Sequence, residues 1–221
     1  MQIELAAADG HRLSAWREGP RDARRALVVV QEIFGVNRHM RHVCSEFAAR
    51  GFAVICPALF DRVEPGVELG YAEADVKRGI ALRGRIDPGA TLLDIEAAAI
   101  ALPSTARRAI VGYCWGGTVA WHGATRSQCF RAAIGYYGGG IAAAREEVPS
   151  CPTQLHFGAE DHGIPLRDVE AVKAARPEVE VFVYAGAGHG FACEERASFH
   201  PAATEQALAR SLDFLDRNLG Q

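Results

Sequence analysis

The chain has 221 residues, of which 49% are hydrophobic and 23% charged, and its formal net charge is -3 at pH 7. This composition predicts a single domain over residues 1–221, and the weak negative charge gives no attraction for nucleic acid. The sequence contains no run of about 18 apolar residues, the length that would indicate a membrane span. Its N-terminus lacks the pattern of a signal peptide. Six scattered cysteines without a C-x-x-C pair predict a cytoplasmic protein with no redox motif and no zinc knuckle.

Strands and helices are predicted to alternate along the chain. It begins with two short strands, 3–5 and 13–16, on either side of Asp9-Gly10, which predicts a hairpin. Apolar runs then predict strands at residues 26–30, 52–56, 108–111, 132–137, 153–157 and 179–184. Helical spacing predicts helices at residues 38–50, 71–82, 88–102, 118–125, 166–175 and 202–219, with a loop at 58–70. This alternation predicts an α/β fold, with a mostly parallel central sheet and helices on both faces.

The segment Gly112-Tyr113-Cys114-Trp115-Gly116-Gly117 joins a predicted strand to a predicted helix. A nucleophile flanked by glycines at such a turn is typical of a nucleophile elbow, where the tight backbone leaves no room for neighbouring side chains. The turn lifts the central side chain above the sheet edge, over the free N–H groups of the helix N-terminus. Cys114 is therefore the candidate nucleophile, at a position where serine is more usual. A buried cysteine in a glycine-rich turn is the alternative that this motif alone leaves open.

Polar residues also follow the ends of other predicted strands, where parallel sheets carry their active sites. These residues are Glu32, Asp161 and His189. The chain order nucleophile, acid, histidine is that of the α/β-hydrolases. We expect His189 to take the thiol proton of Cys114, and Asp161 to orient the histidine ring. Glu160 is the rival acid.

Acyl transfer places negative charge on a carbonyl oxygen, and backbone N–H groups that face this oxygen stabilise the transition state. One donor is expected to be Trp115, which directly follows the candidate nucleophile. The other is expected to come from the loop after the strand at 26–30, where Ile33 is suitably placed. Glu32, the neighbour of Ile33, would then be a carboxylate close to the nucleophile, unless it faces solvent at the strand end.

Six segments together resemble the dienelactone hydrolase (carboxymethylenebutenolidase) family of the α/β-hydrolase superfamily. They are QEIFG (31–35), CPALF (56–60), GYCWGG (112–117), IGYYG (134–138), GAEDHGIP (158–165) and GAGHGF (186–191). The resemblance implies a triad of Cys114, His189 and Asp161, hydrolysis of an unsaturated cyclic ester, and no metal or organic cofactor. It also implies that Glu32 lies beside the resting cysteine and helps to activate the thiol once substrate binding frees it.

The sequence departs from the family pattern where the substrate carboxylate would bind. The best-known members have an arginine four residues after the catalytic histidine, but this chain has Cys193 there and Arg196 three residues further on. A second family arginine comes from the helical region after the second strand, for which the candidates are Arg78, Arg83 and Arg85. We expect the substrate pocket to be lined by Phe34, Tyr113 and Arg83.

The predicted partner is therefore a small ester or lactone that carries a negative charge, and the chain is expected to be a monomer or a small homo-oligomer. Two alternatives remain open. One is a general carboxylesterase or thioesterase with a different acyl pocket on the same fold. The other is a binding protein without catalysis, although such a protein has no need of a complete triad.

Overall fold

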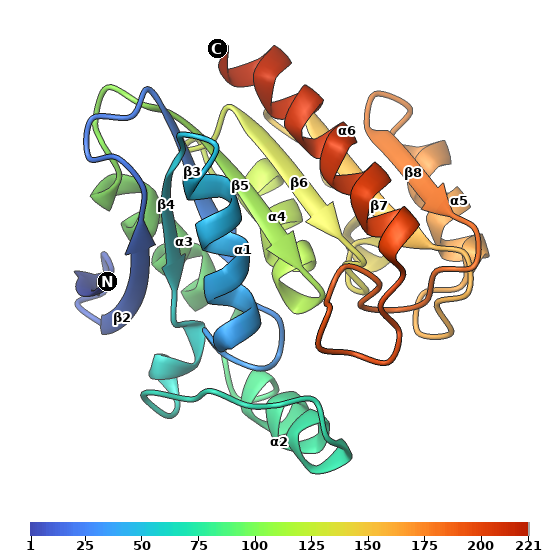
Figure 1. Cartoon of the computed structure of the whole chain (residues 1–221), viewed down its shortest axis with the longest axis horizontal. Helices are drawn as coiled ribbons and strands as arrows, with labels where there is room; N and C mark the ends of the chain where they lie inside the picture. Colours follow the sequence, from blue (N-terminus) through green and yellow to red (C-terminus); the bar gives the residue numbers. More distant parts are fainter. Residues whose placement is uncertain (221) are drawn as a thin grey trace.

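In the computed structural model, which describes residues 1–220, eight strands form one central sheet. The strands are β1 (Gln2–Ala6), β2 (Arg12–Glu18), β3 (Arg25–Val30), β4 (Ala53–Pro57), β5 (Arg107–Tyr113), β6 (Ala132–Tyr136), β7 (Thr153–Gly158) and β8 (Glu180–Tyr184). Their order in the sheet is β1-β2-β4-β3-β5-β6-β7-β8 (Figure 1). β2 pairs antiparallel with both β1 and β4, and all other neighbours pair parallel. The predicted hairpin and the predicted mostly parallel sheet are both confirmed.

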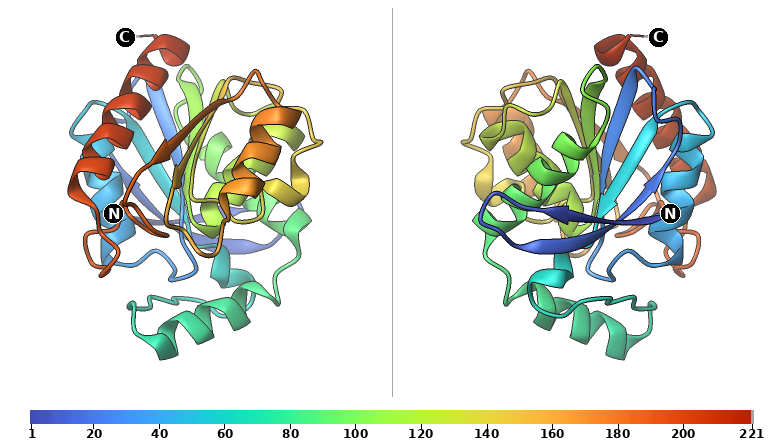
Figure 2. Two further views of the ribbon diagram at one scale, coloured as in Figure 1. Left: turned by 90° about the vertical axis from the view of Figure 1, so that its right-hand side faces the viewer. Right: turned by 90° about the vertical axis from the view of Figure 1, so that its left-hand side faces the viewer.

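Six α-helices accompany the sheet. They are α1 (Arg38–Ala48), α2 (Glu73–Arg83), α3 (Pro88–Ala101), α4 (Trp115–Arg126), α5 (Leu166–Ala175) and α6 (Pro201–Leu219). Figure 2 shows α1 and α6 on one face of the sheet and α3, α4 and α5 on the other, as the sequence predicts. α4 begins three residues before the predicted start, directly after the nucleophile. None of the helices within residues 1–220 is both long enough and apolar enough to cross a lipid bilayer.

The middle of the sheet is buried on both faces. In β3, the side chains of Val28, Val29 and Val30 are 0% exposed, because helices cover both sides of this strand. Complete burial of one such side chain contributes roughly 1.5–3 kcal/mol. The continuous apolar runs in the sequence therefore mark the strands at the centre of the sheet, whose carboxyl ends carry the site.

One segment, residues 59–86, departs from this layered arrangement. It contains the 3₁₀ turn η1 (Leu59–Arg62) and α2, and Figure 1 shows α2 beyond the carboxyl ends of the parallel strands. The segment packs on the loop after β3 through a small separate core made by Ile33, Phe34, Phe60, Val67, Leu69, Leu82 and Ile86.

The predicted loop at 58–70 has more internal structure than the sequence indicates. Asp61 accepts hydrogen bonds from the backbone N–H of Ser14, at 2.7 Å, and of Gly66, at 3.1 Å. The first bond attaches the beginning of the loop to β2, and the second closes a turn within the loop. Both restrict the path of the chain that leads to α2.

Candidate active site

Cys114 lies at a strained turn between β5 and α4. Its backbone has φ 55° and ψ -116°, a left-handed φ that a residue with a side chain rarely adopts. The turn is tight enough that a β-carbon on Gly112 would lie 1.8 Å from the carbonyl oxygen of Gly116. The Cys114 N–H donates to the carbonyl of Tyr136 at 3.0 Å, which attaches the turn to β6. The predicted elbow geometry is therefore present, with the thiol at the N-terminus of α4.

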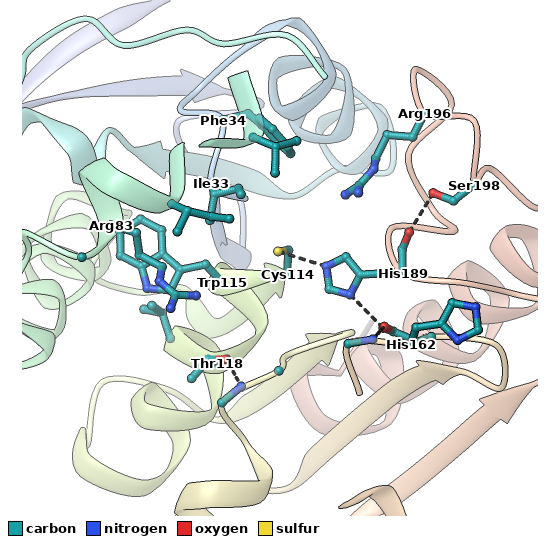
Figure 3. A pocket seen from close by; sticks show the side chains of 18 of the residues that line it. Ile33, Phe34, Arg83, Cys114, Trp115, Thr118, His162, His189, Arg196 and Ser198 are labelled. Carbon is teal, nitrogen blue, oxygen red and sulfur yellow. Dashed lines mark hydrogen bonds and ion pairs between the residues drawn. The ribbon is translucent and has the colours of Figure 1, made fainter. Parts of the chain in front are cut away.

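The structure brings Cys114, His189 and Asp161 together in one hydrogen-bonded chain (Figure 3). The Nε2 atom of His189 lies 3.2 Å from the sulfur of Cys114, and its Nδ1 atom lies 2.7 Å from the Oδ2 atom of Asp161. Asp161 is 4% exposed, and its other oxygen accepts from the backbone N–H groups of Gly163 and Ile164. The ring thus has one nitrogen toward an acid and the other toward a thiol, the arrangement that proton transfer from the thiol requires.

The surroundings of His189 hold the ring and favour its charged form. Its carbonyl accepts a hydrogen bond of 2.7 Å from the hydroxyl of Ser198, and the ring of Tyr137 lies 5.2 Å from the imidazole. Burial opposes a charge on the ring, but the hydrogen bonds to Asp161 and Cys114 outweigh it and raise the pKa of His189 to about 10. A ring with such a pKa is a strong acceptor for the thiol proton.

Ile33 and Trp115 are the residues whose backbone N–H groups the sequence predicts as oxyanion donors. Both residues line the pocket that contains Cys114. Trp115 is the first residue of α4, so its N–H has no acceptor within the helix. The ring of Trp115 stacks on Phe60 with 5.5 Å between the ring centroids, which fixes the start of the helix against the segment 59–86.

Glu32 is buried, with 0% exposure, and it interacts with Arg196 and Tyr71. One carboxylate oxygen lies 3.5 Å from the guanidinium of Arg196, and the hydroxyl of Tyr71 donates to the other at 3.3 Å. Burial raises the pKa of Glu32, although the charges of Arg196 and His189 oppose this shift. The carboxylate is therefore inside the protein and does not face solvent at the strand end, and its hydrogen-bond partners are these two side chains.

The pocket above Cys114 has a volume of about 1050 Å³. Figure 3 shows Arg83 and Arg196 on opposite sides of Cys114. Phe34 lines the pocket, as expected, and the Arg196 guanidinium lies 5.7 Å from the centre of its ring. The other side chains that line the pocket from α2, the α2–α3 connection and α4 are Val76, Ile80, Ile86, Thr118, Val119 and His122. An ester in this space would contact an apolar wall and would lie between two cations.

Three sequence expectations about substrate contacts need correction or narrowing. Tyr113 does not line the pocket: it is 5% exposed and stacks on Tyr136, at 4.7 Å, in the core below the elbow. Its strand position, next to the raised nucleophile, directs its side chain to the opposite side. Arg78 forms an ion pair with Glu64, and neither Arg78 nor Arg85 lines the pocket. Arg83 is the arginine of α2 that does.

Two residues that the sequence did not single out hold this site together. Tyr71 donates to Glu32, and Asn37 in turn donates to the hydroxyl of Tyr71 at 3.2 Å. The Asn37 side chain also accepts from the N–H of Met40, so it caps α1. An asparagine before a predicted helix is a recognisable cap signal, but its contact with Tyr71 joins distant parts of the chain and has no local signal.

The comparisons with known proteins agree with this geometry. The sequence profile described as "Dienelactone hydrolase family" matches residues 13–219. A carboxymethylenebutenolidase of Pseudomonas putida is 34% identical over 224 residues, covering 96% of this chain and 94% of the relative. Carboxymethylenebutenolidase 1 of Cupriavidus pinatubonensis is 33% identical over 223 residues, covering 96% and 95%.

A solved structure from Klebsiella pneumoniae, provisionally named a dienelactone hydrolase, is also similar. It superposes with a TM-score of 0.81 at 27% identity and covers 97% of this chain and 98% of its own. The α/β-hydrolase fold predicted from the sequence is thus confirmed, and the protein is a hydrolase that acts on ester bonds. The chain belongs to the dienelactone hydrolase family.

Proposed function

We propose that the protein opens unsaturated lactones of the dienelactone type through an acyl-enzyme on Cys114. The observation that carries the proposal is the hydrogen-bonded chain from Cys114 through His189 to Asp161, at the floor of a large pocket. The named relatives support the substrate class, because two of them are carboxymethylenebutenolidases.

In the proposed reaction, His189 removes the proton of Cys114 as the sulfur attacks the lactone carbonyl. The oxyanion that forms is held by the N–H groups of Ile33 and Trp115. Collapse of this intermediate breaks the ring C–O bond, and His189 returns the proton to the leaving oxygen. A water molecule, activated by His189, then attacks the thioester, which releases the carboxylic acid and restores the thiol. Asp161 keeps the ring in the tautomer that this sequence of steps needs.

Glu32 enters the proposal through its ion pair with Arg196. When an anionic substrate enters the pocket, Arg196 can exchange the carboxylate of Glu32 for that of the substrate. The Glu32 carboxylate then loses a partner and becomes available as a hydrogen-bond acceptor for the thiol of Cys114. This exchange would couple activation of the nucleophile to substrate binding.

An anionic substrate is supported by the two guanidinium groups at the pocket. Arg83 lines the pocket and forms no ion pair within the described residues, whereas Arg196 is already engaged by Glu32. Arg83 is thus the free cation, and a carboxylate between the two arginines would find a charge on either side.

The alternative function is that of a general carboxylesterase or thioesterase. One observation favours it: the apolar wall made by Val76, Ile80 and Ile86, in a pocket of about 1050 Å³, has room for an acyl group larger than a small lactone. Location in the cytoplasm, the oligomeric state and the single-domain organisation stay predictions from the sequence.

The first test replaces the nucleophile. Cys114→Ala should lower kcat by several orders of magnitude, because removal of the nucleophile of a catalytic triad lowers kcat by about 10⁶-fold. The fold should stay intact, because the alanine side chain is smaller than that of cysteine and fits in the same space. Intact-mass spectrometry with a slowly hydrolysed ester should show one acyl adduct on the wild type and none on the variant. An adduct on Cys114→Ala would refute the assignment. The ratio of kcat/KM for an anionic lactone and its uncharged analogue separates the lactonase from a general esterase.

A further inference from the structure

A second cluster of reactive side chains lies behind the active site. Glu32 follows β3, His39 is on α1, and Cys193 is in the loop after His189. A carboxylate oxygen, a ring nitrogen and the sulfur of these three residues all lie within 4.8 Å of one another. All three residues are buried. The fold thus gathers three metal-ligating groups from three separate segments at one point.

His39 has no hydrogen-bond partner that explains its burial. It is 2% exposed, and neither ring nitrogen has a partner in the part of the chain that the structure describes. A buried polar atom left without a partner costs roughly 1–3 kcal/mol. A histidine binds a metal through a ring nitrogen, and both ring nitrogens of His39 are without a partner among residues 1–220.

A second buried polar group, the hydroxyl of Tyr137, is also unpartnered in the described part of the chain. The hydroxyl of Tyr137 is buried and has no partner within residues 1–220. The ring of Tyr137 lies 5.2 Å from that of His189 and 5.4 Å from that of Phe191, two residues before Cys193. His39 and Tyr137 are therefore both left unsatisfied among the described residues, and native proteins rarely leave buried polar groups without a partner.

We propose that Glu32, His39 and Cys193 bind a thiophilic divalent cation, Zn²⁺ above all. Carboxylate oxygen, imidazole nitrogen and thiolate sulfur are the donors that zinc uses, and sites with three protein ligands and one water are common. Zinc bonds of about 2.0–2.3 Å in a tetrahedron place ligand atoms roughly 3.5 Å apart, so small side-chain rotations close the site. On binding, the S–H bond of Cys193 is replaced by an S–Zn bond, and the thiol proton passes to solvent.

We expect a cation to enter past His39. His39 also lines a second cavity, of about 220 Å³, together with His42, Glu46 and Glu194. The His42 and Glu194 side chains are about half exposed and lie 3.7 Å apart at their polar ends. An imidazole and two carboxylates along the route raise the local concentration of cations. This cavity is separate from the substrate pocket, so its use does not depend on the proposed hydrolase activity.

The bound metal would take Glu32 away from Arg196. The guanidinium of Arg196 lies 3.5 Å from the carboxylate and repels a cation there, but its side chain is 21% exposed and lines the substrate pocket, so it has space to turn outward. Zn²⁺ would also cross-link α1, through His39, to the loop that carries His189, through Cys193.

The test uses the full-length Cys114→Ala protein, so that the active-site thiol cannot bind the probe. Addition of Co²⁺ should give the near-ultraviolet sulfur-to-cobalt charge-transfer band together with visible tetrahedral bands, and Zn²⁺ should displace them. In this background, His39→Leu and Cys193→Ser should each weaken Co²⁺ binding about 100-fold or more, because each removes a ligand. Cys151→Ser, which removes a partly buried thiol elsewhere, should leave binding unchanged.

The variants also report on folding. His39→Leu should raise the melting temperature of the metal-free protein, because it removes two unpartnered nitrogens from the interior. If His39→Leu does not fold, Cys193→Ser, which keeps the size of the side chain, decides the question. Absence of the sulfur-to-cobalt band, or a band that survives Cys193→Ser, would overturn the proposal.

Discussion

The two walls of the substrate pocket are built in different ways. The wall formed by Cys114, Asp161 and His189 consists of residues that follow β5, β7 and β8, and hydrogen bonds to or from the backbone hold each of the three in place. The opposite wall comes from α2, which lies beyond the sheet and packs through a small core of its own. The first wall carries the chemistry, and the second presents Arg83 and apolar side chains to the substrate.

Because of this difference, the positions of the triad residues are fixed, whereas the side chains of α2 can be replaced. A nucleophile, acid and base that follow parallel strands and are held by hydrogen bonds cannot move without disturbing the sheet edge. A helix held by a few contacts can change its side chains, and with them the substrate, while the triad stays in place. We therefore expect substitutions in the triad wall to affect all substrates alike, and substitutions in the α2 wall to affect substrates selectively.

Among the substitutions that compare the two walls, the largest effect is expected from Asp161→Asn. The amide favours the wrong tautomer of His189, and in the serine triad the same change lowers kcat about 10⁴-fold. Steady-state kinetics should show this loss on an anionic lactone and on a neutral ester alike. The matched control is Glu160→Gln, because Glu160 is exposed, lines the pocket and is the neighbouring acid. A severe loss in Glu160→Gln with a mild one in Asp161→Asn would mean that the acid is wrongly assigned.

A smaller and selective effect is expected from Arg83→Ala. A hydrogen bond to a charged group contributes about 1.5–3 kcal/mol, so kcat/KM for an anionic lactone should fall roughly 10- to 100-fold. For the uncharged analogue it should change by less than about 3-fold, because the triad is untouched. Arg85→Ala is the control, since Arg85 is near in sequence and exposed but does not line the pocket. Equal losses on both substrates would show that Arg83 does not recognise the anion.

The triad wall could be predicted from the sequence because its signals are local. Apolar runs mark the strands, and each candidate residue lies in the turn or loop that follows one of them: Cys114 after β5, Asp161 after β7 and His189 after β8. The glycines around Cys114 indicate the strained turn that the structure contains. Since the carboxyl ends of parallel strands meet at one edge, chain order alone brings Cys114, Asp161 and His189 together.

The α2 wall could not be predicted in the same way. The orientation of α2 depends on packing between residues far apart in sequence, and so does the choice of Arg83 over Arg78 and Arg85. Tyr113 shows a related limit, because proximity in sequence to the nucleophile does not decide which side of the strand a side chain faces. The pair of Glu32 with Arg196 spans 164 positions, and no local pattern indicates it.

The smallest effect is expected where the α2 wall contacts the loop after β3, which serves the chemistry of the triad wall through the proposed oxyanion donor Ile33. Gly79 of α2 packs against the loop of the proposed oxyanion donor: a β-carbon added there would lie 2.0 Å from the carbonyl oxygen of Ile33. Gly79→Ala must therefore move α2 or the loop, although alanine itself favours the helix by about 1 kcal/mol. A shift of the Ile33 peptide would misplace the donor, and displacement by about 1 Å can cost up to 10²-fold in rate.

We expect kcat of Gly79→Ala to fall roughly 10-fold for anionic and neutral substrates alike, because the oxyanion forms with both. Gly84→Ala is the matched control, since a β-carbon at Gly84 would have its nearest neighbour at 3.5 Å, an ordinary contact, and should leave kcat unchanged. If Gly79→Ala changes only the ratio between the two substrates, α2 moves without the Ile33 loop and the two walls are independent. If kcat falls for both, α2 also supports the oxyanion site, and evolution of the specificity wall is constrained by the chemistry at this one contact.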